Sequence, residues 1–286
     1  MNLQSKLTIG FIGQGWIGKN YANDFEERSF NVLRYSLDEA YVHNKEKIKD
    51  CDVVFVAVPT PTISQKFDGH SVKESLSLIG EGKIAVIKST LYPGFTKILQ
   101  DMFPHIFILY NPEFLSVVSA EFDARHPERN IVGVLKGSKS HLEKATLLMS
   151  ILAKAKYEKI CSFEEAEIIK YYRNVVGYAR TIFTNIFYDL AISTQADWEV
   201  IKQSVAADHD FGDVYLTPVH KNGRGAGGGC FIKDFEAFLQ AYKEKVPSDK
   251  NAIKILEIMR DKNIELLKGT KKDEKLLSEV YGEYLI

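Results

Sequence analysis

Cysteine is scarce in this 286-residue sequence, and neither sign of charge is in excess. The three cysteines, Cys51, Cys161 and Cys230, form no C-x-x-C pair, so we expect no disulfide framework and no bound metal. With 37 Lys and Arg residues against 38 Asp and Glu residues, the formal net charge is −1. No global field therefore attracts the chain to nucleic acid or to an anionic membrane, and we expect neither as a partner.

Long hydrophobic runs are also absent. The longest apolar stretches, such as Val53 to Val58, are too short to cross a bilayer. The start of the chain, Met1 to Lys6, lacks the apolar core of a signal peptide. Because 45% of the residues are hydrophobic and 26% are charged, as in folded globular proteins, we expect a cytoplasmic protein with one large domain or two small ones.

The first half of the chain alternates short apolar runs with amphipathic stretches of helical length. This pattern predicts an α/β fold with a doubly wound, Rossmann-type parallel sheet over residues 1–160. The apolar runs are continuous, which suits strands covered on both faces. The predicted strands are residues 7–12, 31–35, 52–58, 84–88, 106–110 and 131–135.

The second half, residues 161–286, is predicted to be a mostly helical domain. Ser162 to Glu165 is a capping-box pattern, and neither Gly nor Pro follows until Gly177. One segment, Lys221 to Cys230, is different, because it holds five of the 19 glycines. The predicted helices are residues 163–194, 198–208, 234–244 and 249–267.

A glycine motif follows the first predicted strand and opens a helix. Its spacing, Gly13-x-Gly15-x-x-Gly18, is that of a dinucleotide fingerprint: a tight turn, close backbone approach to a pyrophosphate, and close packing of helix on strand. A tight turn without a ligand is the alternative. The acidic residue that usually ends the second strand is replaced by Ser36, with Arg34 before it, which leaves NAD and NADP both open.

Polar residues also follow the third, fourth and fifth predicted strands, at the edge where ligands bind in such sheets. They are Val58-Pro59-Thr60-Pro61, Ser89-Thr90 and Asn111-Pro112-Glu113-Phe114-Leu115. The hydroxyl groups are equally consistent with turn formation, and Glu113 with a carboxylate at the start of a helix.

Two further groups of residues are candidates for chemistry. Lys170 and Asn174 are four apart on one face of the long helix, with Glu167 one turn earlier, although a solvated helix face would look the same. Cys230 ends the glycine segment, and Asp234 follows four residues later. A lone cysteine is usually buried and inert, but neighbouring glycines leave a thiol accessible and present backbone N–H groups to an anion.

Taken in order, these motifs resemble those of the UDP-glucose/GDP-mannose dehydrogenases. The resemblance extends from Lys6 to Leu267, and its most specific parts are Asn111 to Leu115 and Gly227-Gly228-Gly229-Cys230-Phe231-x-Lys233-Asp234. Members of that family use NAD to oxidise the C6 alcohol of a nucleotide sugar to a carboxylate. They do so in two hydride transfers, through a thioester on the motif cysteine.

The resemblance implies a role for each candidate residue. Cys230 would trap the aldehyde as a thiohemiacetal that becomes a thioester, Lys170 and Asn174 would stabilise the oxyanion, and Asp234 and Glu113, the latter through water, would act as acid and base. The implied cofactor-binding residues are Gly13, Gln14, Gly15, Trp16, Ile17, Gly18, Ser36, Val58, Pro59, Thr60, Ser89, Thr90 and Lys233. The implied substrate-binding residues are Glu113, Phe114, Leu115, Lys170, Asn174, Lys221, Gly225, Gly227 and Gly228.

The sequence also departs from the family. Ser116-Val117-Val118 replaces an Ala-Glu-Gly, which removes a carboxylate, and Ala226 replaces a Phe, which removes an apolar wall of the sugar pocket. No residue matches the substrate-contacting arginine that precedes the glycine segment. The family's second nucleotide-binding-like domain has no counterpart before Ile286, so we expect a pocket that is more open, altered, or completed by another subunit.

Two other functions are alternatives to the nucleotide-sugar dehydrogenase, and the sequence also predicts an oligomeric state. A two-electron 3-hydroxyacid or 6-phosphogluconate-type dehydrogenase also places Lys and Asn four apart, but it has no need of Cys230. A catalytically silent cofactor-binding or scaffold protein would not need the intact catalytic set. A homodimer is expected, because the long helix has more apolar residues than a thin domain can bury, namely Ile168, Val175, Ile182 and Ile186.

Overall fold

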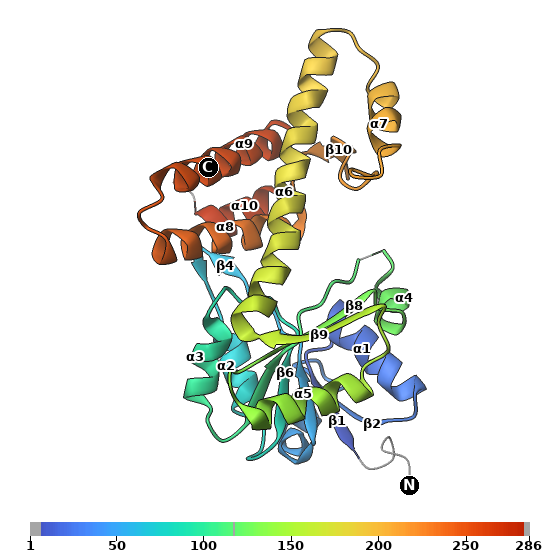
Figure 1. The fold of residues 1–286 in the computed structure, drawn as a ribbon, viewed down its shortest axis with the longest axis vertical. Coiled ribbons are helices and arrows are strands. Elements are labelled where there is room, and N and C mark those ends of the chain that lie inside the picture. Colours follow the sequence, from blue (N-terminus) through green and yellow to red (C-terminus); the bar gives the residue numbers. More distant parts are fainter. Residues whose placement is uncertain (1–6, 117, 283–286) are drawn as a thin grey trace. The chain divides into compact units, whose positions relative to one another are not determined.

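The structure, a computed structural model, describes residues 7–116 and 118–282, and the chain forms two compact units (Figure 1). The first unit extends to Thr60 and resumes from Asp68 to Lys170. The second contains Pro61–Phe67 and the chain from Tyr171 onward. Along the chain, this division falls inside a helix, and a short excursion adds residues 61–67 to the second unit.

A single seven-stranded sheet is the centre of the first unit. The strand order is β2-β1-β3-β6-β7-β8-β9, so the chain winds outward from β1 in both directions. All neighbouring strands are parallel except β7 and β8. The strands are β1 (Thr8–Ile12), β2 (Asn31–Tyr35), β3 (Val53–Val56), β6 (Ile84–Ile87), β7 (Phe107–Tyr110), β8 (Arg129–Val134) and β9 (Tyr157–Ser162). The predicted Rossmann-type fold is confirmed.

The sheet differs from the prediction at one edge. β8 was expected in a parallel sheet but runs antiparallel to β7, and β9 was not predicted. The β9 strand contains Glu158 and Lys159, and its first half is exposed. A strand at the edge of a sheet is covered incompletely, so it lacks the continuous apolar run that identified the other strands.

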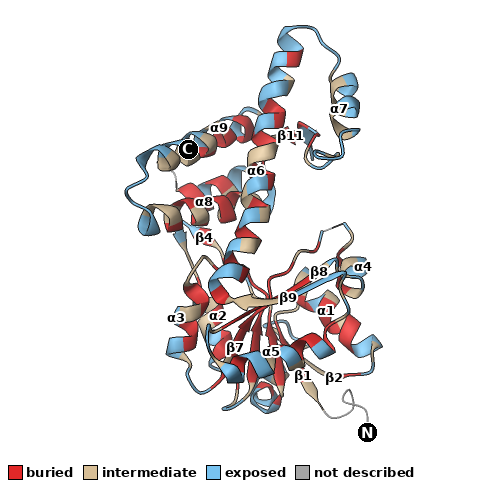
Figure 2. Cartoon of the chain, in the orientation of Figure 1, coloured by how far each residue is buried: buried red, intermediate tan, exposed pale blue. Residues whose placement is uncertain are grey.

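Helices pack on both sides of this sheet, as in Figure 1. Figure 2 shows that the central strands are buried along their length. Phe11 and Phe55 stack with ring centres 4.8 Å apart, and Phe25 of the first helix packs against both rings. The helical elements of this unit are α1 (Trp16–Glu27), the 3-10 helix η2 (Val42–Asp50), α2 (His70–Leu76), α3 (Phe95–Met102), α4 (Ala120–Arg125) and α5 (Lys139–Ile151).

The second unit is mostly helical, as predicted. Helix α6 (Phe163–Ser193) enters it from the first unit. Two apolar clusters form its core, one around Leu267 and Val280 and the other around Tyr178 and Phe235. Its other elements are α7 (Trp198–Ala206), α8 (Gly228–Lys245), α9 (Lys250–Gly269), α10 (Glu274–Tyr281) and the hairpins β4 (Thr62–Ile63) with β5 (Lys66–Phe67) and β10 (Val219–His220) with β11 (Gly223–Arg224).

Helix α8 begins earlier than predicted. The expected start was Asp234, but the helix includes Gly228, Gly229 and Cys230 in its first turn, after Gly227 at the N-cap. Glycine has a low helix propensity, and three in a row resemble a loop. The correction matters because it places the thiol of Cys230 at the N-terminus of a helix.

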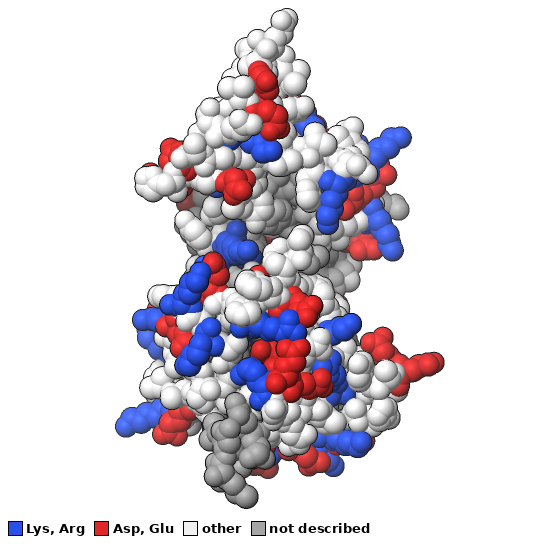
Figure 3. All heavy atoms as spheres, turned by 90° about the vertical axis from the view of Figure 1, so that its right-hand side faces the viewer, with Lys and Arg blue, Asp and Glu red and all other residues white. Residues whose placement is uncertain are grey.

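The described part of the chain has no helix that is both long enough and apolar enough to cross a bilayer. On the face drawn in Figure 3, basic and acidic side chains are interspersed. This distribution agrees with the net charge of −1.

Candidate active site

The glycine motif forms the turn between β1 and α1. A side chain at Gly13 or Gly18 would collide with a backbone carbonyl oxygen, and Gly13 also has a positive φ of 90°. These two glycines are therefore required by the turn itself and by the packing of α1. At Gly15, the N-cap of α1, a Cβ would meet nothing within 4 Å. The space beside Gly15 is what a pyrophosphate requires, so the turn fits a dinucleotide.

The first turn of α1 faces this space with backbone N–H groups and no acidic side chain. Trp16 and Ile17 are its first residues, and the side chain of Trp16 is 37% exposed. Gln14 donates to the carbonyl oxygen of Gly13 at 3.2 Å, which stabilises the turn.

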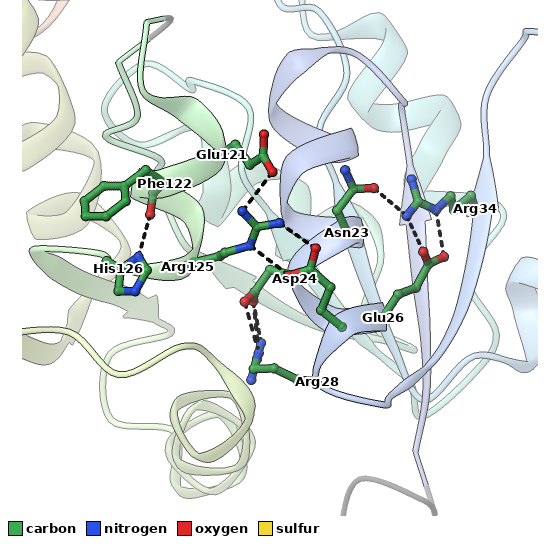
Figure 4. Close-up of polar contacts among 10 residues, drawn as sticks. Asn23, Asp24, Glu26, Arg28, Arg34, Glu121, Phe122, Arg125 and His126 are labelled. Carbon is green, nitrogen blue, oxygen red and sulfur yellow. Dashed lines mark hydrogen bonds and ion pairs between the residues drawn. The ribbon is translucent and has the colours of Figure 1, made fainter.

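The end of β2 carries the residues that would distinguish NAD from NADP. The Arg34 guanidinium donates to Glu26 Oε2 at 2.7 Å and to Asn23 Oδ1 at 2.8 Å, both on α1 (Figure 4). Its charge is thereby neutralised. The Ser36 hydroxyl donates to a carboxylate oxygen of Asp38 at 2.8 Å. A carboxylate beside Ser36 would repel a 2′-phosphate, so this arrangement favours NAD.

The hydroxyl groups at the ends of β3 and β6 bind the backbone. Ser89 Oγ accepts from Val58 N at 3.0 Å and donates to Val58 O at 2.7 Å, and Thr60 Oγ1 donates to Thr90 O at 2.9 Å. Turn formation therefore accounts for these hydroxyl groups. Pro59 is exposed and Val58 and Thr90 are partly exposed, so these residues are accessible at this edge of the sheet.

Glu113 and Lys170 lie together in the first unit. The ammonium of Lys170 donates to Glu113 O at 2.7 Å and lies 3.4 Å from Glu113 Oε1. Leu115 N donates to Glu113 Oε2 at 2.6 Å, and the ring of Phe114 lies 5.6 Å from Lys170 Nζ. Both charged side chains are buried, so Lys170 does not belong to a solvated helix face. In the described residues no helix begins at Glu113, so it is not a helix-start carboxylate.

Glu167, one turn before Lys170, has a structural role. Its carboxylate accepts from Gly94 N at 2.6 Å and from Thr96 N and Oγ1 at 2.8 and 2.6 Å. These donors lie at the start of α3 (Phe95–Met102), which the carboxylate caps. Burial raises the pKa of Glu167 to about 7, against the opposing effect of these hydrogen bonds.

A second polar cluster lies in the helical unit. Asp234 is buried, and its carboxylate accepts from Asn174 Nδ2 at 2.7 Å and from Lys233 Nζ at 2.5 Å.

Cys230 lies one turn before Asp234 in α8 and is exposed. Of the other cysteines, burial raises the pKa of Cys51 and of Cys161 to about 11, which favours unreactive thiols. Cys230 thus lies in the first turn of α8, at the end of the helix that carries positive dipole charge.

The glycine segment runs from the β10–β11 turn to α8. Lys221 and Asn222 adopt left-handed conformations in this turn, and Gly225 has φ 86°. Gly227 and Gly228 follow, and Gly228 N donates to a carboxylate oxygen of Asp273 at 2.7 Å.

Two segments of the sequence match two domains of one known protein family. Residues 36–150 match the profile of the UDP-glucose/GDP-mannose dehydrogenase family, NAD binding domain, and residues 164–264 match its central domain. The chain belongs to this family. Its predicted membership and its cofactor, NAD, are confirmed, and it is classed with oxidoreductases. The glycine turn precedes the matched residues, so its assignment depends on the geometry described above.

Curated relatives cover this chain only in part. The UDP-glucose 6-dehydrogenase TuaD of Bacillus subtilis is 31% identical over 210 residues, which are 68% of this chain and 43% of that protein. The UDP-glucose 6-dehydrogenase of Campylobacter jejuni is 31% identical over 219 residues, 73% of this chain and 53% of that protein. The chain thus spans about half the length of these relatives.

Solved structures share the fold at lower identity. A UDP-glucose dehydrogenase from Pyrobaculum islandicum superposes with a TM-score of 0.77 at 22% identity, covering 91% of this chain and 69% of that one. A 3-hydroxyisobutyrate dehydrogenase from Mycobacterium tuberculosis superposes with a TM-score of 0.64 at 16% identity, covering 91% and 96%. At these identities the similarity establishes the fold alone.

The structure also bears on the departures from the dehydrogenase family. Ala226 is buried against Tyr178 and Phe235 in the core of the helical unit, so its side chain is not a pocket wall. Ser116 N donates to Asp123 at 2.8 Å, whereas Val117 lies outside the described residues.

Sequence reasoning missed two sets of residues near the site. Lys272 donates to Gly225 O at 3.0 Å, and Asp273 binds Gly228, so the chain after α9 contacts the glycine segment. No local pattern predicted this contact. Lys88 is a buried lysine beside the segment that carries Glu113. The sequence could have indicated this residue, because Lys88 is the one charged residue at the end of an otherwise apolar predicted strand, residues 84–88.

Proposed function

We propose that this protein oxidises the C6 alcohol of a UDP-glucose-like nucleotide sugar to the uronic acid, through a covalent bond to Cys230. The observation that carries the proposal is the placement of Cys230. It is exposed in the first turn of α8, one turn from the buried Asp234 that binds Asn174.

The reaction has three chemical stages. Loss of a hydride from C6 and of the hydroxyl proton gives the aldehyde. The thiolate of Cys230 adds to the aldehyde carbon, and loss of a second hydride converts this thiohemiacetal into a thioester. Water then hydrolyses the thioester, which releases the carboxylate and the thiol. When bound, NAD supplies the hydride acceptor for both oxidations.

The other residues handle protons and negative charge. Lys170 and Asn174, one turn apart on α6, supply an ammonium and an amide that stabilise negative charge on the C6 oxygen. Asp234 and Glu113, the latter through water, accept and return protons. Lys221 and the backbone N–H groups of the glycine segment bind the substrate diphosphate.

We also propose a homodimer through α6. Among the predicted residues, Ile168 and Ile186 are exposed. Ile182 is buried and Val175 packs partly buried against the same core, so these two are not available for an interface. Phe187 and Leu190, which were not predicted, are also exposed. Such a row of apolar side chains on one helix is typical of an interface.

The dimer is tested by light scattering, which should give twice the 32.4 kDa chain mass. Phe187→Asp should shift the protein to monomer, and Leu37→Asp, at an exposed apolar position in the first unit, should not. A monomeric wild type at working concentration would remove this proposal.

A two-electron 3-hydroxyacid dehydrogenase is the second candidate. It is favoured by Lys170 and Asn174, one turn apart on α6, because this reaction also needs charge stabilised on the reacting oxygen but needs no thiol. The two candidates differ in electron count, because the nucleotide-sugar reaction yields two reduced cofactors per substrate and the hydroxyacid reaction yields one.

The deciding experiment is a screen of nucleotide sugars and hydroxyacids with NAD, with absorbance counting the reduced cofactor formed per substrate. Cys230→Ser should permit the first oxidation, lose the second hydride slowly, and then stall as an ester at residue 230, because an ester hydrolyses more slowly than a thioester. The ester is visible as added mass. Cys161→Ser, at a partly buried position in β9, is the matched control and should turn over normally. Full four-electron turnover by Cys230→Ala at the wild-type rate would exclude the covalent mechanism.

A further inference from the structure

Lys88 is a buried cation to which the proposed reaction assigns no role. It directly follows β6 and is 2% exposed. Its ammonium donates to Asn111 Oδ1 at 2.7 Å and lies 3.7 Å from the centre of the Tyr21 ring. Burial lowers its pKa to about 7. An apolar side chain of similar length would fill this space without that cost of burial, so packing alone does not explain a lysine here.

The contacts of Lys88 lead to the proposed catalytic pair. Asn111, which accepts from Lys88, also donates from Nδ2 to Ile131 O at 2.7 Å. Two residues later, Glu113 accepts from Lys170 at its carbonyl oxygen. The segment from Asn111 to Glu113 is therefore held by an ammonium at each end, one from the end of β6 and one from α6.

The same groups are linked by charge. Among the described residues, the charged groups that act on Lys88 are Glu113, which favours its ammonium form, and Lys170, which opposes it. Tyr21 covers Lys88 with its ring, and Asn111 is neutral. Lys88 is thus coupled to both members of the Glu113–Lys170 pair.

We propose that Lys88 is a positioning residue that holds the segment 111–115 through the Asn111 side chain, so that Glu113 and Lys170 keep their contact. The kinetic part of this inference rests on the proposed function. The conformational part depends only on the contacts of the first unit.

The conformational part is tested by hydrogen exchange, followed by mass spectrometry, in Lys88→Met. Residues 111–116 should exchange roughly tenfold faster than in wild type, because the segment loses one of its two anchors. Lys83→Met is the matched control: Lys83 immediately precedes the same strand, is partly exposed and binds Asp52 at 2.9 Å. Its exchange in segment 111–116 should equal that of wild type.

The kinetic part uses the nucleotide-sugar assay. Lys88→Met should lower kcat roughly 10- to 100-fold while the Kd for NAD stays unchanged. The KM for the nucleotide sugar should also stay close to that of wild type, because the segment 111–115 is misplaced but the substrate-binding groups are kept. A general loss of folded structure would raise KM and the Kd for NAD together with the fall in kcat.

The outcomes are distinct. Unchanged exchange of 111–116 in Lys88→Met, or a wild-type kcat in that variant, overturns the proposal. A wild type that oxidises no nucleotide sugar refutes the proposed function, and the exchange comparison then decides the role of Lys88 alone. Should Lys88→Met not fold, Lys88→Gln replaces it: this shorter, uncharged polar side chain keeps Asn111 and its bond to Ile131 intact, and it must loosen the same segment.

Discussion

Replacing Gly15 by alanine should weaken NAD binding without destabilising the protein. Gly15 has φ −66°, which alanine adopts freely, and a Cβ there meets nothing within 4 Å. Alanine in place of glycine at an N-cap should change the free energy of unfolding by less than about 1 kcal/mol. The added methyl group would instead occupy the space proposed for the pyrophosphate. Weakening two hydrogen bonds to a charged group costs about 1.5–3 kcal/mol, or roughly a 10- to 100-fold increase in Kd.

A second glycine of the same motif provides the contrast. A Cβ at Gly18 would collide with the carbonyl oxygen of Gly13, in the backbone of the turn. Gly18→Ala should therefore lower the free energy of unfolding by about 2 kcal/mol or more, whatever the ligand. The two substitutions separate the binding role of the motif from its packing role.

The assay is calorimetric titration of NAD, paired with urea unfolding of the protein without NAD. Gly269→Ala is the matched control, because a Cβ at this last residue of α9 also meets nothing within 4 Å. It should leave both quantities unchanged. Wild-type affinity in Gly15→Ala, or a loss of stability equal to that of Gly18→Ala, would refute this account of the turn.

Three further predictions concern stability and substrate binding. Glu167→Ala removes the acceptor of three donors, of which the two on Thr96 are buried, and should cost about 3 kcal/mol in urea unfolding. Glu164→Ala, exposed in the same helix, should cost little, and equal effects would contradict the capping role. The pKa of Lys88 is about 7 when folded and 10.5 ordinarily, so between these values the unfolded chain binds more protons and the free energy of unfolding rises with pH. Lys88→Met should remove this rise, which unfolding curves from pH 7 to 10 would detect, and an unaltered slope would count against it. Asp273→Asn should lower KM for the nucleotide sugar roughly two- to fivefold, because it removes a negative charge at the start of α8. Glu274→Gln, exposed in α10, should leave KM unchanged. A raised KM in Asp273→Asn would show that Asp273 helps substrate binding.

Local patterns in the sequence determined the fold class and much of the candidate site. The glycine spacing 13-x-15-x-x-18 acts within one turn, so the sequence alone predicted a dinucleotide-binding turn before α1. Lys170 and Asn174 lie on one helix face because a helix repeats every 3.6 residues. Continuous apolar runs identified the strands that are covered on both faces, and failed for β9, where charged residues interrupt the run.

Long-range packing decided the rest. Glu113 and Lys170 are 57 residues apart, and Asn174 and Asp234 are 60 apart, so no periodicity within one element relates them. Likewise, no local pattern predicts that Asp273 binds Gly228. A charged side chain is buried only where the fold brings it a partner, and that partner is set by how strands and helices far apart in the chain pack together. The residue types were therefore visible in the sequence, whereas their burial and pairing were determined only by the tertiary structure.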